Sequence, residues 1–262
     1  MKNLIFYKYQ GTGNDFVMID NRQNYFPKDN IAKIAQLCDR RFGIGADGLI
    51  LLENDFDTDF KMVYYNSDGN QSTMCGNGGR CIVAFAKKLE IVNNLATFTA
   101  IDGLHHATID INETISLQMQ NVSEIKVEHD YVFLNTGSPH HVTMVENLPI
   151  YKVKENGSKI RNSDLYGTVG SNVNFVTQIA ANEFTIRTFE RGVEDETFSC
   201  GTGATATAIA MHAIKKTIAN QIKINVEGGE LEISFDKIDK IYKNVFLKGK
   251  AEFVFKGEIQ ID

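Results

Sequence analysis

Apolar and polar residues alternate along much of this 262-residue chain, a pattern typical of half-buried antiparallel strands. The clearest alternating runs are residues 107–111, 115–119, 184–189, 231–235 and 251–255. Three other segments have the composition of helices, namely Ile31–Phe42, the run from Gly78 to Leu89 and the run from Ala204 to Lys216. The pattern therefore predicts many strands and few helices.

The second and third of these helices are apolar on nearly every side. Residues 81–86 are all apolar in one, and alanines dominate residues 204–213 of the other. Because a helix that is apolar all round must be buried, we expect each at the centre of its own lobe, wrapped by the strands around it. Each run ends in a lysine pair, 87–88 and 215–216, which suits the negative end of the helix dipole.

The same motif begins both helices. Residues 75–78 and 200–203 each read Cys-Gly-x-Gly, about one ordinary domain apart. The repeat predicts an α+β fold of two pseudo-symmetric lobes. We place the N-terminal lobe, carrying Cys75, at residues 1–120 and the C-terminal lobe, carrying Cys200, at residues 121–250, with the last strand, about 251–262, able to return to the first lobe.

The connection between the lobes has no stretch rich in Pro, Gly and Ser, and the chain contains only three prolines. Such a connection does not act as a flexible tether, so we expect the lobes to pack together. The cleft between two packed lobes is the natural place for a binding site.

Composition limits the classes of partner. A hydrophobic content of 43%, a charged content of 23% and a net charge of −6 describe a soluble protein with no basic field for nucleic acid or a membrane surface. No apolar run approaches the roughly 18 residues that span a bilayer, and residues 1–7 turn polar too soon for a signal peptide. We expect a cytoplasmic protein that acts on a small molecule.

Four cysteines, at positions 38, 75, 81 and 200, are too few and too widely spaced for a disulfide scaffold, and they lack the spacing of a zinc site. We expect Cys38 and Cys81 to be small buried hydrophobes. Cys75 and Cys200 differ because the start of a helix stabilises a thiolate and binds anions. A structural disulfide between these two is the alternative, and a reducing compartment argues against it.

Two thiols on opposite sides of a tetrahedral carbon can invert it, since one removes a proton as a base and the other delivers a proton as an acid. A thiol titrates near pH 8.5 when free, and lower at a helix N-terminus, so a thiolate and a thiol can coexist near neutral pH. The backbone amides of residues 76–77 and 201–202 could hold a substrate carboxylate and stabilise the developing negative charge. Such a reaction needs no cofactor and no metal.

Six longer motifs occur in order over nearly the whole chain: Gln10–Phe16, Phe42–Gly48, Tyr65–Gly69, Met74–Cys81, Phe189–Gly192 and Glu196–Ala204. Together they resemble the diaminopimelate epimerase family. The resemblance implies a cofactor-independent epimerase that interconverts LL- and meso-2,6-diaminopimelate for lysine and peptidoglycan precursor synthesis. It also implies that each lobe is a mostly antiparallel, β-barrel-like sheet around its central helix, and that the protein is a homodimer.

The resemblance assigns roles position by position. Cys75 and Cys200 take the place of the acid/base pair. The residues expected to bind substrate are Asn14, Asn66, Gly76, Asn77, Asn174, Glu190, Arg191, Gly201 and Thr202. An Arg can fork onto a carboxylate, a Glu can accept from an ammonium group and an Asn can do either, as a free amino acid requires. Ser138, His140 and Glu190 are expected to support the site or to tune the ionisation of the cysteines.

Two positions depart from the family pattern. Ser138 replaces an Asn that would bind the distal end of the substrate, and Gly48 stands where some members carry a Gln. Neither departure touches the cysteines, so both concern the grip on the substrate and leave the reaction type intact.

Four other functions compete. A proline or hydroxyproline racemase would use the same chemistry, but those enzymes resemble Cys-Gly-His-Gly where this chain has Asn77. Isomerases of the phenazine-biosynthesis type lack the paired cysteines. A thiol redox protein would show a Cys-x-x-Cys pair, which the chain lacks. A two-lobed amino-acid-binding protein without chemistry would keep its function when Cys75 is replaced by Ser, whereas an epimerase would lose turnover.

Overall fold

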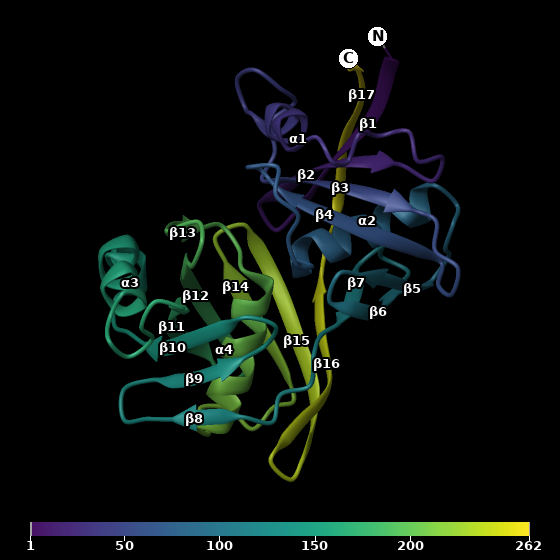
Figure 1. Ribbon diagram of the computed structural model, residues 1–262. Helices are drawn as coiled ribbons and strands as arrows, with labels where there is room; N and C mark the ends of the chain where they lie inside the picture. The colour runs from purple at the N-terminus through teal and green to yellow at the C-terminus, as the bar shows by residue number, and fades with distance from the viewer. Residues whose placement is uncertain (1, 262) are drawn as a thin grey trace. The chain divides into compact units, whose positions relative to one another are not determined.

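The computed structural model describes residues 2–261, which form two compact units (Figure 1). Unit 1 extends to Leu117 and takes up the chain again from Gly249, and unit 2 is Gln118–Lys248. The change from unit 1 to unit 2 falls inside strand β7 (Ile115–Gln118), and the return falls at the end of strand β16 (Ile241–Gly249). Unit 1 is therefore built from both ends of the chain.

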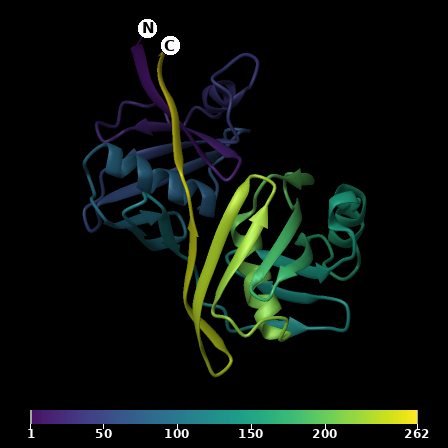
Figure 2. The same ribbon diagram turned by 180° about the vertical axis from the view of Figure 1, so that it is seen from behind.

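Unit 1 is a mixed sheet in the order β17-β1-β2-β3-β4-β5-β6-β7. Its other strands are β1 (Lys2–Gly11), β2 (Asn14–Asp20), β3 (Gly48–Glu53), β4 (Phe60–Asn66), β5 (Leu95–Ala100), β6 (Gly103–Ile109) and β17 (Glu252–Ile261). Neighbours are antiparallel except for the parallel pairs β2–β3 and β4–β5. The purple β1 and yellow β17 lie side by side in both views (Figures 1 and 2).

Unit 2 is a sheet in the order β8-β9-β10-β11-β12-β14-β15-β16, with β13 also paired to β12. Its other strands are β8 (Ile125–Val127), β9 (Val132–Asn135), β10 (Pro139–Met144), β11 (Asn172–Ala180), β12 (Glu183–Glu190), β13 (Asp195–Thr197), β14 (Gln221–Val226) and β15 (Gly229–Ile238). The parallel pairs are β10–β11 and β12–β14.

The two units share one topology. In unit 1 the run β1 to β6 pairs antiparallel, parallel, antiparallel, parallel and antiparallel, and β9 to β15 of unit 2 repeat this order. A parallel pair needs a crossover connection. The crossovers carry α1 (Ile31–Cys38) and α2 (Gly76–Lys88) in unit 1, and η1 (Leu148–Ile150) with α3 (Val153–Arg161), then α4 (Gly201–Ala213), in unit 2. The expected α+β fold of two similar lobes is confirmed.

Helices α2 and α4 are the central helices of their units. Ten of the thirteen residues of each are buried. Helix α2 packs on β1, β2, β3 and β17, and α4 packs on β9, β10, β11, β12, β14 and β15. The apolar composition of these two segments correctly predicted their burial, and hydrophobic area removed from water holds each helix against its sheet.

The ends of the helices differ from the sequence-based bounds. Helix α1 stops at Cys38 and not at Phe42, because the N–H groups of Ile44 and Gly45 turn back to the Leu37 carbonyl at 2.9 and 3.1 Å. Helix α4 stops at Ala213, because Lys215 takes a left-handed conformation at φ 61°. Its lysine pair therefore follows the helix, whereas the lysine pair of α2 lies in the last turn.

Helix α3 was not predicted from the sequence, and strand β17 is more exposed than predicted. Helix α3 contains Asn156 and Gly157, which are weak helix formers, but it is held by the burial of Val153 and by contact with Phe189 of β12. The alternating run 251–255 predicted a half-buried strand, yet β17 exposes three consecutive apolar side chains, Phe253, Val254 and Phe255, by 42%, 53% and 44%.

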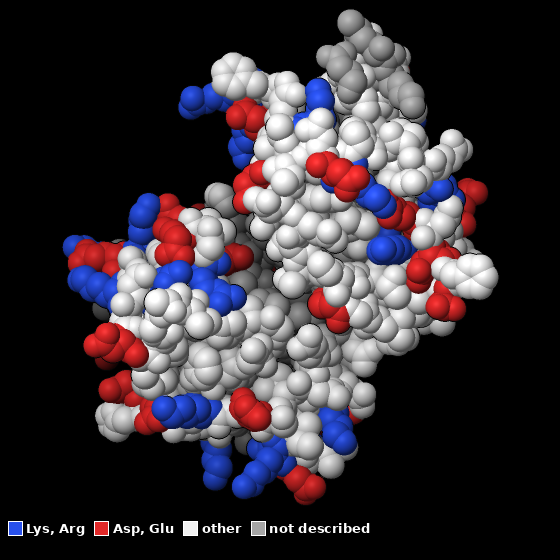
Figure 3. Space-filling view, in the orientation of Figure 1, with Lys and Arg blue, Asp and Glu red and all other residues white. Residues whose placement is uncertain are grey.

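Surface charges of both signs are mixed on the face shown in Figure 3. Around α3, lysines and arginines pair with acids: Lys154 with Asp195 at 2.6 Å, Lys159 with Glu155 at 2.8 Å and Arg161 with Glu194 at 3.0 Å. Exposed pairs of this kind add little stability. Within residues 2–261, no helix is long and apolar enough to cross a membrane.

The contact between α3 and β12 predicts the effect of Gly157→Ala. A Cβ at this position would lie 2.3 Å from the Cβ of Phe189, so the variant must displace either the helix or the strand. We expect a loss of about 1–3 kcal/mol in unfolding free energy, measured by urea denaturation, although Ala is the better helix former. The control Lys159→Ala, on the exposed side of α3, should change it by less than about 0.5 kcal/mol; equal effects would contradict this packing.

Candidate active site

Each of the two candidate catalytic cysteines is the residue just before a central helix. Cys75 precedes α2 with extended backbone angles of φ −94° and ψ 131°, and Cys200 precedes α4 with φ −123° and ψ 107°. Their carbonyls accept the first helical hydrogen bonds, from Gly79 N–H at 2.7 Å and Ala204 N–H at 2.8 Å. Both sulfurs are therefore attached where the positive end of a helix dipole favours a thiolate.

A glycine three residues after each cysteine lets the helix approach the strand behind it. A Cβ on Gly78 would lie 3.0 Å from Cδ1 of Ile50 on β3, and a Cβ on Gly203 would lie 2.4 Å from Oδ1 of Asn174 on β11. Strands β3 and β11 occupy equivalent places in the two units. The repeated Cys-Gly-x-Gly motif thus fixes each cysteine at the same place relative to its sheet.

In unit 1, a chain of side-chain amides leads away from the start of α2. Asn77 Nδ2 donates to Asn14 Oδ1 at 2.5 Å, and Asn14 Nδ2 donates to Asp47 Oδ2 at 3.0 Å. Since a carboxylate only accepts hydrogen bonds, Asp47 fixes which way the Asn14 amide is turned. Two of the expected substrate-binding residues, Asn14 and Asn77, are therefore in direct contact and held in one orientation.

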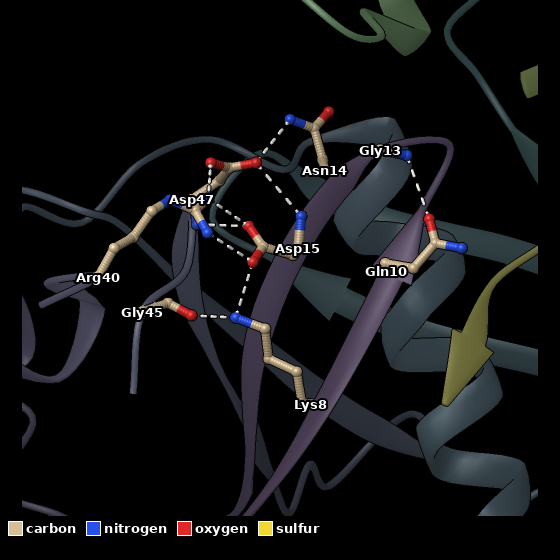
Figure 4. A network of polar contacts seen from close by, with 8 residues as sticks. All are labelled: Lys8, Gln10, Gly13, Asn14, Asp15, Arg40, Gly45 and Asp47. Carbon is tan, nitrogen blue, oxygen red and sulfur yellow. Dashed lines mark hydrogen bonds and ion pairs between the residues drawn. The ribbon is translucent and has the colours of Figure 1, made fainter. Parts of the chain in front are cut away.

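Asp47 belongs to an ionic network that supports Asn14 (Figure 4). Arg40 bridges Asp15 and Asp47, each at 2.7 Å, and Lys8 bonds to Asp15 at 2.8 Å and to the Gly45 carbonyl. Burial raises the pKa of Asp15, but hydrogen bonds from Arg40 and Lys8 outweigh it and lower the pKa to about 2. Asp15 is thus a fixed anion at neutral pH.

Asn66 lies at the exposed end of β4, opposite Gly48 of β3 in the sheet register. A Cβ on Gly48 would lie 2.5 Å from Cε2 of Tyr64 and 2.6 Å from the Tyr65 carbonyl oxygen. Tyr64 and the backbone thus occupy the space that a longer side chain would need.

In unit 2, hydrogen bonds determine the tautomer of His140. Thr188 donates to Asn174 Oδ1 at 3.0 Å, so the Asn174 amide nitrogen faces His140 Nδ1 at 3.1 Å and donates to it. His140 Nε2 must then carry the proton, which it donates to Ser138 Oγ at 2.9 Å. Burial, with a smaller effect of the Arg191 charge, lowers the pKa of His140 to about 3. His140 is neutral at physiological pH.

The same chain of hydrogen bonds continues to the sulfur of Cys200. Ser138 Oγ accepts from His140 and, at 3.1 Å, from Asn172, so its own proton goes to Thr202 Oγ1 at 3.2 Å. Thr202 in turn donates toward Cys200 Sγ at 3.4 Å. The Ser that departs from the family pattern is therefore one link in an ordered chain that ends at the cysteine.

Glu190 and Arg191 follow one another at the end of β12. Glu190 Oε2 accepts from Thr197 Oγ1 at 3.0 Å. Arg191 is tied through its N–H to Asn172 Oδ1 at 2.9 Å and through its guanidinium to the Val169 carbonyl at 3.2 Å. Both side chains are half-buried, and their opposite charges suit the two ends of an amino acid.

Sequence reasoning missed several residues that hold these sites. Asp47, Asn172 and Thr188 orient the expected substrate-binding residues, and Arg80 lies buried beneath the start of α2. Arg80 left a signal in the sequence, as a charged residue beside the apolar run 81–86 of its helix, and Asp47 lies within the motif Phe42–Gly48.

Cys38 and Cys81 are buried as expected, and burial raises the pKa of each thiol to about 12. Neither thiol ionises at neutral pH, so neither competes with Cys75 or Cys200 as an acid or base. Among residues 2–261, no three His, Cys, Asp or Glu side chains lie together as a metal site requires.

Comparison with known proteins adds to this geometry. A sequence model of diaminopimelate epimerase matches residues 6–125 and 132–254. A curated relative of that name from Flavobacterium psychrophilum is 70% identical over 253 residues, which cover 97% of this chain and 99% of the relative. The diaminopimelate epimerase of Chlorobaculum tepidum is 40% identical over 260 residues, 96% of this chain and 99% of its own.

The chain belongs to the diaminopimelate epimerase family. It is therefore an enzyme of the isomerase class. Among solved structures, a PhzF-family phenazine biosynthesis protein of Bacillus anthracis covers the whole chain with a TM-score of 0.79 at 14% identity. A hydroxyproline epimerase from Agrobacterium vitis covers 98% of this chain and 92% of its own with a TM-score of 0.69 at 11% identity. At such low identity, both likenesses show the fold alone.

The ionic network under Asn14 predicts a pH dependence of stability. The pKa of Asp15 is lower in the folded protein than its ordinary value of 3.8, so its stabilising contribution is complete above about pH 4 and is lost as the pH falls toward 2. In Asp15→Asn the unfolding free energy should be lower at pH 7, and the difference from wild type should shrink between pH 4 and pH 2. Urea denaturation across this range measures it, and a difference independent of pH would refute the assignment.

Proposed function

We propose that this enzyme interconverts LL- and meso-2,6-diaminopimelate, with Cys75 and Cys200 as a thiolate/thiol pair that acts on opposite faces of one α-carbon. The observation that supports the proposal is the pair of cysteines at equivalent helix starts, one in each of two units with the same topology. Inversion at carbon requires one base and one acid on opposite sides, and an architecture of two alike units supplies one of each.

In the proposed reaction one thiolate removes the α-proton and becomes a thiol. The carbon–hydrogen electron pair stays on the α-carbon and is delocalised into the adjacent carboxylate. The other thiol then delivers its proton to the opposite face and becomes a thiolate. Atoms and charge balance without any cofactor, and the two cysteines have exchanged protonation states at the end of each turnover.

The start of each central helix would stabilise the charge that develops during this reaction. The backbone N–H groups of Gly76, Asn77, Gly201 and Thr202 occupy first turns, where four N–H groups lack a partner within the helix. Such groups favour a carboxylate and its carbanionic form, because they are already oriented and need no rearrangement.

The amino and carboxylate groups of the substrate would be held by Asn14, Asn66, Asn174, Glu190 and Arg191. In the same proposal His140 is a positioning residue. It is neutral, and its hydrogen bond to Ser138 orients the Ser138 hydroxyl toward Thr202. The product would serve lysine and peptidoglycan precursor synthesis in the cytoplasm.

The test is incubation with LL-diaminopimelate in deuterated water, without cofactor and under reducing conditions. We expect the α-proton to be exchanged and the meso form to appear, followed by NMR and chiral separation. Cys75→Ser and Cys200→Ser should each lower turnover by at least about 100-fold, as expected when a positioned acid or base is lost. The matched control is Cys38→Ser, which removes a buried thiol that takes no part in the reaction.

The outcomes separate the competing functions. Exchange of proline or hydroxyproline in place of diaminopimelate would keep the chemistry and reject the substrate. Diaminopimelate binding that survives Cys75→Ser, with no exchange by the wild-type protein, would establish a binding protein and reject the epimerase.

We also propose that the enzyme is a homodimer and that β17 lies in its interface. Three consecutive apolar side chains of this strand are 42–53% exposed, and the Phe253 ring packs against Tyr7 and Tyr9 of β1. Exposed apolar patches often mark interaction surfaces. Light scattering coupled to size exclusion should give about twice the 29.3 kDa chain mass, and Val254→Lys should shift it toward the monomer. A wild-type mass of one chain would reject the dimer.

A further inference from the structure

Arg80 is a fully buried cation in the central helix of unit 1. Its exposed fraction is 0%, and among the described residues it is one of the largest side chains that are fully buried. It donates to the Gly76 carbonyl at 3.3 Å, to Thr12 Oγ1 at 3.1 Å and to Asn77 Oδ1 at 3.0 Å, while its buried Nε has no hydrogen-bond partner. All three acceptors are neutral, and among residues 2–261 no carboxylate forms an ion pair with it.

A buried charge without a counterion is costly, so the groups that can compensate it matter. Burial lowers the pKa of Arg80, and the charges that act in the opposite sense are those of Cys81 and Cys75. An Arg keeps its proton even so. Burial raises the pKa of Cys81 to about 12 and that of Tyr9, on β1, above its ordinary value, so both are neutral at pH 7. Cys75 is then the group that can supply the negative charge.

The other charged groups around α2 are engaged elsewhere. From the strands packed on it, Asp15 pairs with Arg40, Glu53 pairs with Lys28, and Glu252 accepts from Gln10. Asp102, which precedes β6, accepts from the Met74 N–H and lies 3.2 Å from His105 Nε2. A carboxylate beside Met74 disfavours a second negative charge at position 75, whereas the Arg80 cation and the positive end of the helix dipole favour it.

The equivalent position in unit 2 is neutral. Arg80 comes five residues after Cys75, and Thr205 comes five residues after Cys200. Thr205 is also 0% exposed, and its hydroxyl donates to the Gly201 carbonyl at 3.0 Å, just as Arg80 donates to the Gly76 carbonyl. The two central helices therefore begin alike but differ by one buried positive charge.

We propose that Arg80 makes the two cysteines unequal: Cys75 ionises at a lower pH than Cys200, so the free enzyme carries its thiolate on Cys75 and its thiol on Cys200. The inference rests on the proposed two-thiol reaction and adds to it the resting state of the pair. Arg80 also acts as a positioning residue, since its bond to Asn77 Oδ1 turns the Asn77 amide so that Nδ2 faces Asn14.

The surroundings of Cys200 are consistent with the higher ionisation pH. The sulfur of Cys200 has a neutral hydroxyl donor in Thr202. A neutral hydrogen bond stabilises a thiolate less than a full positive charge in a poorly solvated place does. The asymmetry thus arises from the charge at one position and not from a difference in helix geometry.

The experiment is alkylation by iodoacetamide as a function of pH, with each cysteine quantified by peptide mass spectrometry. Cys75 is followed in Cys200→Ala and Cys200 in Cys75→Ala, so that neither thiol influences the other. We expect the midpoint for Cys75 to lie at least about one pH unit below that for Cys200. These variants all keep Arg80. Equal midpoints for the two cysteines, or a lower midpoint for Cys200, would overturn the proposal.

Three further variants assign the difference to Arg80. Arg80→Met keeps the length of the side chain without the charge and should raise the Cys75 midpoint by about one unit, whereas Arg80→Lys should retain most of the wild-type value. Thr205→Val, the matched change in unit 2, should leave the Cys75 midpoint in place. An Arg80→Met variant that keeps the wild-type midpoint contradicts the assignment.

Turnover gives a second, independent readout. In Arg80→Met, the acidic limb of kcat/KM against pH should move to higher pH, and Arg80→Lys should restore it; a uniform loss at all pH values would indicate a structural role only. Because the alkylation midpoints are measured without substrate, a failure of the proposed epimerase activity leaves them interpretable and is distinguished from a failure of this inference.

Discussion

The close contact between each central helix and the strand behind it is the constraint on which the candidate site residues of both units depend. An added methyl group would lie 2.4 Å from Asn174 Oδ1 on β11 at Gly203 and 3.0 Å from Ile50 Cδ1 on β3 at Gly78, so both helices pack tightly against side chains of these strands. With the helix held there, the cysteine before it, the amides after it and the polar residues of the neighbouring strands all take fixed places. A closely packed core resists small displacements, so the packing of each helix limits the movement of the cysteine before it.

The direction of the hydrogen bonds fixes the orientation of the polar side chains in each unit. In unit 1 a donor-only guanidinium at one end and an acceptor-only carboxylate at the other fix Asn77 and Asn14 between them. In unit 2 the sequence from Thr188 through Asn174, His140, Ser138 and Thr202 has one consistent direction and ends at Cys200. The units share a topology, yet one uses a buried cation where the other uses neutral groups.

Much of the fold could be predicted from the sequence because the signals are local and repeated. Period-two alternation marks strands such as β6 and β12, and the duplicated Cys-Gly-x-Gly motif indicates two alike lobes. Helix α3 was not predicted, because tertiary contact with Phe189 overrides the weak helix propensity around Gly157. The cysteines could be found from their context, whereas the link from Ser138 to Thr202 depends on β10 and α4 meeting in space, which no local pattern records.

The pairing of β17 with β1 has a consequence for how the chain is made. Unit 2 is a single continuous stretch, whereas unit 1 needs β17 to complete its sheet beside β1. During synthesis β1 therefore keeps an unpaired edge until β17 has been translated, whereas every strand of unit 2 is translated before β17. Translation of unit 1 therefore begins first, but its sheet is completed last, because β17 joins β1 only after the whole of unit 2 has been translated.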